Sequence, residues 1–215
     1  MLEAVASVLL VNINWWVRFD YIATSGFPLA FFFLAVWWSF RMLPSTMYDS
    51  DDGVRVVDVC LLCFLMDMMQ VCVHYSAHTF LKNTAIGNSH MLHHEHRKPT
   101  PQDAFYTGFV DATTQLMLPL WCTLHIVTPS KWTAIVFGCA YSWWLLFIHS
   151  SPERAFPLLS SMGFVTPRYH HEHHRDPTRH FSHLLTLHWG RPDDRRATLK
   201  SHRTSQHDHY KRTDE

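Results

Sequence analysis

The stretch VRVVDVCLLCFLMDMMQVCVHYSAH, residues 54–78, joins a long apolar run to a pair of histidines. Its first twenty residues match the length of helix, about 20 residues, that crosses the hydrocarbon of a bilayer. Two acids, Asp58 and Asp67, interrupt the run. His74 and His78 end it with the i, i+4 spacing that places two side chains on one face of a helix. The stretch therefore predicts a membrane helix that brings two imidazoles to one of its ends.

Three more apolar stretches are long enough to enter or cross a bilayer: 27–43, about 109–128, and 132–149. Turn-rich segments at 44–53 and 128–131 connect them in pairs. We therefore expect an all-α integral membrane bundle of about four transmembrane helices, arranged as two hairpins with a His-rich helical cap. The polar blocks 82–101 and 150–215 then fall on one side of the membrane, and their basic residues place that side in the cytosol.

Length and composition narrow the class of protein. The 215 residues suit one domain, 1–190, followed by a polar tail, 191–215. The formal net charge is zero, so nothing favours a nucleic-acid partner. All five cysteines lie in apolar stretches and imply no disulfide framework. The first residues lack a convincing cleavable signal, and the apolar segment 2–16 is either a further span or an interfacial helix. A soluble helical protein remains the alternative.

Histidine is the outlier of the composition, with 18 residues. The pattern H-x-x-H-H occurs twice, where random order would give roughly 0.1 occurrences. On a helix this spacing places the rings about 5 to 6 Å apart at Cβ, close enough to share a metal. The predicted ligands all lie where an apolar run meets polar sequence: His74, His78, His90, His93, His94, His149, His170, His173 and His174.

Nine imidazoles exceed the three or four that one tetrahedral zinc takes, so the count predicts two metals. An all-imidazole site suits zinc, copper, iron or nickel, and ligand type alone does not choose among them. The other histidines have simpler interpretations. His96 and His171 either assist the ligands or face solvent, and His125 is a core or interface histidine. The tail histidines, His202, His207 and His209, are ordinary solvated residues.

The residues around these histidines resemble a known family. HMLHHEHRKPTP (90–101), DATTQ (111–115) and HFSHLLTLHWG (180–190) are similar to segments of sterol C-5 desaturases, in the fatty acid hydroxylase/sterol desaturase superfamily of membrane di-iron oxygenases. The resemblance covers roughly residues 65–190. The chain departs from the desaturase pattern at three places, which bears on its substrate: Gly108 and Phe109 replace His-Pro, His180 to Ser182 replace Asn-Tyr-Gly, and His188 and Trp189 replace Trp-Asp.

The resemblance implies two iron ions, with O₂ as co-substrate and two electrons, that desaturate or hydroxylate a lipid or sterol. A fatty acyl or sterol hydroxylase of the same superfamily is the alternative. The electrons would come from a b-type cytochrome and its NAD(P)H reductase. The membrane would be that of the endoplasmic reticulum, with the active site facing the cytosol.

Carboxylates near the histidines are candidates for orienting the ligand rings: Asp67, Asp111 and Glu172, with Glu95 as a further one. Asp67 shares one helical stripe with Gln70, His74 and His78, so we expect it beneath the metals, accepting a hydrogen bond from a ligand ring. A purely structural pairing with a neighbouring helix is the alternative. Asp58 has Arg55 three residues away as a local partner.

Two other classes of protein use membrane histidines. A metal transporter would place its ligands near the bilayer midplane, whereas these clusters lie at segment ends. A membrane zinc hydrolase needs an open site and a general base, for which Glu172 or Glu95 would serve. Its site would leave most of these histidines unused.

Overall fold

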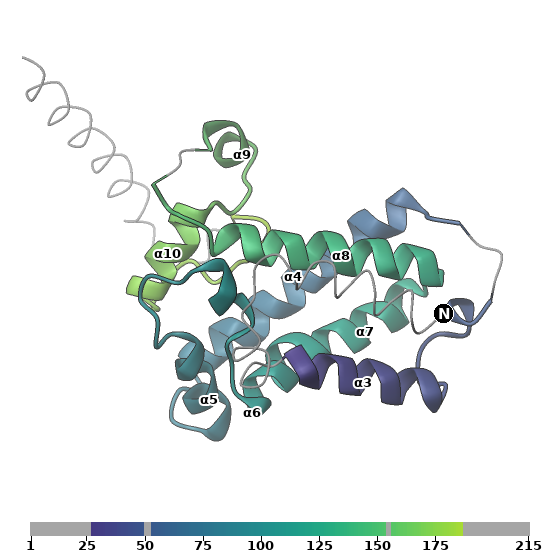
Figure 1. The fold of residues 1–215 in the computed structure, drawn as a ribbon. Helices are drawn as coiled ribbons and strands as arrows, with labels where there is room; N and C mark the ends of the chain where they lie inside the picture. The colour runs from purple at the N-terminus through teal and green to yellow at the C-terminus, as the bar shows by residue number, and fades with distance from the viewer. Residues whose placement is uncertain (1–26, 50–52, 154–155, 187–215) are drawn as a thin grey trace, which may run out of the picture.

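The computed structural model describes residues 27–49, 53–153 and 156–186, and within these ranges the chain is helical, as predicted (Figure 1). The elements are α3 (Phe27–Ser39), η1 (Ser45–Met47), α4 (Val56–His78), α5 (Ala85–His93), η2 (Pro101–Phe105), α6 (Phe109–Asp111), η3 (Ala112–Met117), α7 (Leu118–Val127), α8 (Lys131–Ile148), α9 (Pro157–Ser161) and α10 (Pro167–Arg175). The β-pairing in these ranges is an isolated bridge between Phe164 and Leu185. The predictions for segment 2–16, for tail 191–215 and for His188 and Trp189 lie outside the described residues.

The connections that follow α3 and α7 meet at one end of the molecule, which we call the turn end. The hydroxyl of Thr46, after α3, donates to the carbonyls of Thr128 at 3.1 Å and Pro129 at 2.9 Å, after α7. The hydroxyl of Ser130 donates to the carbonyl of Gly53 at 2.9 Å. As a result α4 and α8 begin at the turn end, run side by side and finish together at the opposite end, where α5 and α10 lie (Figure 1).

The third predicted apolar segment is one continuous helix from Phe109 to Val127, built from α6, η3 and α7. Its middle, Ala112–Met117, is π-helical, a local widening that is frequent at functional sites. Thr128 ends the helix in the left-handed conformation, with φ 49°. The side chain of Ser130 then caps α8 by accepting the backbone N–H of Thr133 at 3.2 Å.

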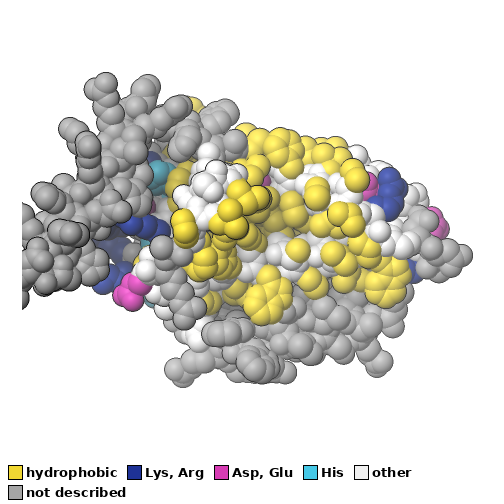
Figure 2. Space-filling view, turned by 90° about the horizontal axis from the view of Figure 1, so that it is seen from above, with side chains coloured by type: hydrophobic (Ala, Val, Ile, Leu, Met, Phe, Trp, Pro, Cys, Tyr) yellow, Lys and Arg dark blue, Asp and Glu magenta, His cyan; other side chains and the backbone are white. Residues whose placement is uncertain are grey.

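A compact core holds these helices together. Leu62 and Met66 of α4 pack with Met117, Phe137 and Ile148, and each of the five is at most 2% exposed. The outward faces are also apolar, and hydrophobic side chains cover the middle of the face in Figure 2. By length and composition, α4 and α8 are candidates to cross a membrane, and Ala30–Ser39 is a shorter apolar helix. The four-span arrangement therefore stays a prediction beyond these two helices.

Candidate metal centre

The end of the bundle opposite the turns, which we call the metal end, gathers nine histidines into two groups. In each group the ligand nitrogens all lie within 4.8 Å of one another. The first group is His74, His78, His90, His94 and His173, and the second is His93, His149, His170 and His174. These are the nine histidines that the sequence pattern singled out. They come from the end of α4, from α5, from the residue after α8 and from α10.

The H-x-x-H-H pattern divides its rings between the two groups. In the first pattern His90 and His94 belong to the first group, and His93 belongs to the second. In α10 the assignment is reversed, because 170 and 174 join the second group and 173 joins the first. Residues four apart stack on one helical face, while the residue between them points to one side. Each short helix therefore contributes to both groups and holds them next to each other.

Within each group the Nε2 atoms face one another at short range. In the first group the Nε2–Nε2 distances among His78, His90 and His94 are 3.0 to 3.2 Å. In the second group Nε2 of His170 lies 3.1 Å from that of His149 and 3.2 Å from that of His174. Several lone pairs converging on one point repel each other unless a cation lies between them.

The same distances also bear on the number of ligands. Metal–imidazole bonds of about 2.1 Å give adjacent nitrogens about 3.0 Å apart in an octahedral arrangement and about 3.4 Å apart in a tetrahedral one. The observed separations of 3.0 to 3.2 Å lie at or above the octahedral value and below the tetrahedral one. The residues therefore fit a metal ion with imidazole ligands in each group.

The outer nitrogen of most of these rings is held by the surrounding chain. A ring that donates Nδ1–H outward presents the lone pair of Nε2 inward, which is the form that binds metal. Five rings have Nδ1 within 3.1 Å of an acceptor: His74 with the carbonyl of Phe181, His93 with that of Tyr106, His149 with that of Leu145, His173 with that of Arg179, and His90 with the carboxylate of Asp111. The chain thus orients the rings before any metal binds.

Asp111 lies where a carboxylate that orients a ligand ring is expected. It is 3% exposed, and its Oδ1 lies 2.9 Å from Nδ1 of His90. Its other oxygen accepts the hydroxyl of Thr107. Its backbone N–H donates to the hydroxyl of Ser89 at 3.1 Å. Both carboxylate oxygens and the backbone of Asp111 are therefore held in place.

The prediction that Asp67 accepts a hydrogen bond from a ligand ring is wrong. Its carboxylate is completely buried and accepts three backbone N–H groups, from His183 at 3.0 Å, Leu184 at 2.9 Å and Leu185 at 2.9 Å. No imidazole donates to it among the described residues. The bonds join α4 to a segment more than a hundred residues further along the chain, which sequence periodicity does not locate. Asp58, in contrast, pairs with Arg55 at 3.1 Å, as expected.

Glu172 also differs from its predicted role. Its carboxylate lies 3.3 Å from Nε of Arg168 and 3.7 Å from Nε2 of His180, and neither residue belongs to a metal group. It lies between ligands in sequence, but on a helix the intervening residue points elsewhere. Glu95 accepts the hydroxyl of Tyr106 at 3.2 Å on the surface.

The two interleaved histidines contact the chain around the centre rather than the groups. Nδ1 of His96 lies 2.8 Å from Asp103, whose other oxygen accepts the N–H and the hydroxyl of Thr100. Nε2 of His171 lies 3.0 Å from the carbonyl of Ser150. Both stabilise loops that carry ligands or their partners.

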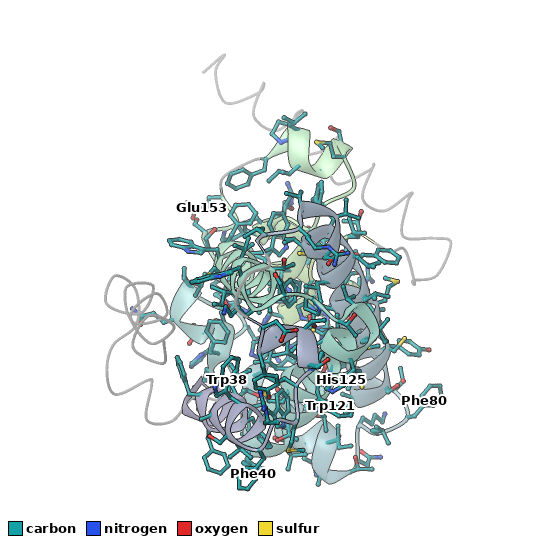
Figure 3. The ribbon with its side chains drawn as sticks, turned by 90° about the vertical axis from the view of Figure 1, so that its right-hand side faces the viewer. Trp38, Phe40, Phe80, Trp121, His125 and Glu153 are labelled. Carbon is teal, nitrogen blue, oxygen red and sulfur yellow. The ribbon has the colours of Figure 1, made fainter. Side chains whose placement is uncertain are left out.

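His125 lies apart from both groups, as predicted for a core or interface histidine. It lies on α7 against Trp121, with ring centroids 4.1 Å apart, and both residues are labelled in Figure 3. Its Nδ1 lies 2.9 Å from the carbonyl of Trp121. This half-buried ring offers a matched control for substitutions at the centre.

Sequence reasoning missed His183. Its ring stacks on that of His74, with centroids 4.9 Å apart and 19° between the planes. A further ligand after α10 was not apparent, because His183 follows His180 at an interval of three without the H-x-x-H-H pattern. Its place near the centre depends on the tertiary contact with Asp67.

Burial lowers the pKa of several rings at the centre. Desolvation, followed by the charge of neighbouring rings, lowers the pKa of His149, His170 and His173 well below the usual histidine value. The same causes lower the pKa of His183 to about 3. Neutral imidazole is the form that coordinates a metal, so the centre is ready to bind at neutral pH.

Comparison with known proteins agrees with this geometry. The family model for fatty acid hydroxylase matches residues 59–195, more than half of the chain. The chain belongs to the fatty acid hydroxylase family. The matched region contains all nine histidines of the two groups.

One curated relative in these comparisons is an alternative squalene epoxidase of Phaeodactylum tricornutum, 29% identical over 164 residues. The match covers 74% of this chain and 46% of the relative, so the chain spans about half the length of the curated relative it matches. No solved structure matches this member of the fatty acid hydroxylase family.

Proposed function

We propose that this chain is a membrane-bound di-iron oxidoreductase that uses O₂ and two electrons to oxidise a lipid. The observation that carries the proposal is the pair of adjacent all-imidazole groups at one end of an apolar helical bundle. Iron is preferred to zinc for two reasons. The family is generally iron-dependent, and the nitrogen separations lie below the tetrahedral value.

The residues of the chain hold and orient the two ions. Five rings would bind one ion and four rings the other, with Asp111 and the backbone carbonyls fixing the ring tautomers. Bound there, the iron pair would supply the O₂ chemistry that attacks an unactivated bond, which no side chain provides. The deep burial of His170 and His173, both 0% exposed, excludes bulk water from the centre. A b-type cytochrome and its NAD(P)H reductase would supply the electrons.

The substrate class is an apolar lipid. Hydroxylation places one oxygen atom of O₂ in the product and, with two electrons and two protons, releases the other as water. Epoxidation of a double bond has the same balance, and desaturation releases both oxygens as water. The relative's name adds an isoprenoid hydrocarbon to the candidates, beside fatty acyl chains and sterols.

The bundle would lie in the membrane of the endoplasmic reticulum with the metal end facing the cytosol. The outward face of α4 supports insertion, since Val57 is 78%, Leu61 42% and Phe64 45% exposed. An apolar stripe of this kind is costly in water and ordinary in lipid. In this arrangement all four long helical segments would cross the bilayer, and the turn after α3 would face the lumen.

A conversion assay tests the proposal. Membranes containing the chain, a b-type cytochrome and its reductase receive squalene, a sterol and a fatty acyl lipid in separate reactions. We expect an O₂-dependent product from one lipid class, lost in His93→Ala and retained in the control His125→Ala. Iron-loaded protein that oxidises none of the three classes would contradict lipid oxidation.

The alternatives predict other outcomes of the same preparation. A transporter would carry metal across sealed vesicles, although the groups lie at the end of α4 and just after α8 rather than near their middles. A zinc hydrolase would contain zinc and need no O₂. Zinc-dependent, O₂-independent turnover would therefore replace the proposed function.

A further inference from the structure

His183 lies against both metal groups without belonging to either. Its ring stacks on His74 of the first group, with centroids 4.9 Å apart. Its centroid also lies 5.7 Å from that of His170, in the second group. The groups defined by mutual ligand distance do not include it. The ring therefore flanks the pair rather than completing either set of ligands.

The backbone of His183 is fixed at both of its polar atoms. Its N–H donates to the buried carboxylate of Asp67 at 3.0 Å, and its carbonyl accepts Nε1–H of Trp144 at 2.6 Å. Asp67 also holds the next two residues through their N–H groups. A fully buried carboxylate in an apolar helix is costly and by default marks function. Here it fixes the position of one additional ring beside the metals.

The Nδ1 atom of this ring is buried and has no hydrogen-bond partner in the chain. Buried polar side-chain atoms normally have a partner, so each exception needs an explanation. Nε2 of His74, the ring it stacks on, is in the same condition and is explained by the metal. Because His183 belongs to neither group of mutually close ligand nitrogens, the partner to consider for its Nδ1 is a small molecule beside the two groups.

We propose that His183 is a positioning residue of the metal centre, whose Nδ1 hydrogen-bonds a small exogenous molecule carried by the metals, and that Asp67 sets its place. The inference rests on the proposed di-iron centre and deepens it. Water is the simplest molecule of this kind, and nitric oxide is a probe of the same position. Stacking on His74 places the ring beside that ligand rather than on its metal.

The test compares wild type with His183→Leu, His183→Gln and the control His125→Leu. Iron per chain is measured first, and nitric oxide is then bound to the ferrous protein. The signals are the electron paramagnetic resonance spectrum and the dissociation rate of the adduct. Loss of one hydrogen bond predicts a dissociation rate about threefold to tenfold faster in His183→Leu. Glutamine, which retains polar atoms, should recover part of this change, and His125→Leu should match wild type.

Each other result overturns the inference in an identifiable way. If His183→Leu loses iron while the wild-type protein retains it, His183 is itself a metal ligand. If His183→Leu has full iron and its spectrum and dissociation rate equal those of wild type, His183 makes no hydrogen bond to the bound molecule. Wild-type iron protein that does not bind nitric oxide would exclude an exogenous molecule at this position. Wild-type protein without iron would instead overturn the proposed function, on which the inference rests.

A substitution at the other end of the contact adds a second, independent arm. Asp67→Asn keeps the shape of the side chain but replaces one carboxylate oxygen with an NH₂ donor. At least one of the three hydrogen bonds from backbone N–H groups is therefore lost. We expect it to change the nitric oxide signals in the same direction as His183→Leu, while iron content stays unchanged. Signals identical to wild type in folded Asp67→Asn protein would contradict the role assigned to the carboxylate.

Discussion

The two ends of the helix bundle satisfy their polar groups in different ways. At the turn end, the chain itself supplies the partners. The hydroxyl of Thr46 donates to two carbonyls, and the backbone N–H of Arg55 donates to the hydroxyl of Thr133 at 2.9 Å. At the metal end, Nε2 of His74 and Nδ1 of His94 are buried without a hydrogen-bond partner.

The difference shows which end of the fold is complete by itself. The turn end needs nothing beyond the polypeptide, so its stability should not depend on metal. The metal end presents converging lone pairs that only a cation stabilises, and metal binding there adds to folding stability. Predictions that separate the two ends test this comparison.

The largest effect is expected when a ligand is removed. His90→Ala takes one ring from the first group and leaves the carboxylate of Asp111 buried without its imidazole. Loss of a residue that hydrogen-bonds a metal ligand typically lowers metal affinity or activity about 10-fold to 100-fold. Loss of the ligand His90 itself should therefore reduce turnover by more than about 100-fold and lower the amount of bound iron. Metal analysis and turnover measure both, with His125→Ala as the control. Full iron and full turnover in His90→Ala would remove it from the site.

Metal removal should affect the two ends unequally. Ligand at about 100 times its dissociation constant adds about 2.7 kcal/mol of stability, so chelation should lower the melting temperature clearly. Hydrogen exchange should rise in α5 and α10 and stay nearly unchanged at η1 and at 128–131. Equal increases at both ends would contradict the comparison.

The metal-free protein should also become less stable in acid. The buried rings of His149, His170 and His173 have lowered pKa values, whereas unfolded histidine titrates near 6.5. Below about pH 6.5 the unfolded chain therefore binds protons that the folded chain does not, so the stability of the folded chain decreases as the pH is lowered. Melting temperatures of chelated protein from pH 8 to pH 5 measure this loss. A melting temperature that does not change over this range would contradict neutral buried rings.

A smaller effect is expected at the carboxylate behind the ligands. Asp111→Asn keeps the shape and removes the charge that faces Nδ1 of His90, so metal affinity should fall about 10-fold to 100-fold. Competition with a chelator of known affinity measures the change. Glu172→Gln is the matched control, because Glu172 contacts Arg168 and His180 instead of a ligand. Equal losses in both variants would show a general charge effect rather than ring orientation.

Much of this centre could be predicted from local spacing. The i, i+3 and i+4 intervals identified the rings at 90, 93 and 94 and those at 170, 173 and 174 because one helical turn determines their relative positions. The order of the long helices and the two connections at the turn end followed from apolar runs and turns for a similar reason. The family resemblance was also correct at the level of the superfamily.

The rest depends on contacts between distant parts of the chain. Asp67 was correctly singled out as unusual, but its partners lie 116 to 118 residues away, and no periodicity links them. His183 was missed for the same reason, because its role becomes visible only when that segment returns to α4. Glu172 was chosen from proximity in sequence, whereas its side chain points away from the ligands on α10.

The smallest effect is expected at the turn end. Thr46→Val removes a hydroxyl that donates to the carbonyls of Thr128 and Pro129. The cost should be about 1 kcal/mol of unfolding free energy, typical of one hydrogen bond, with iron content unchanged. Denaturation and metal analysis of the same sample measure both quantities. A loss of iron in Thr46→Val would contradict the independence of the two ends.

The most direct measurement of the central claim is the metal content of wild-type protein purified in detergent without oxygen. Five and four imidazoles, held next to each other in two groups, predict two iron ions per chain. The matched variant His149→Ala, which changes only the second group, should lose iron while His125→Ala retains both ions. A single zinc ion per chain, or no bound metal after purification from iron-supplied cells, would contradict the account.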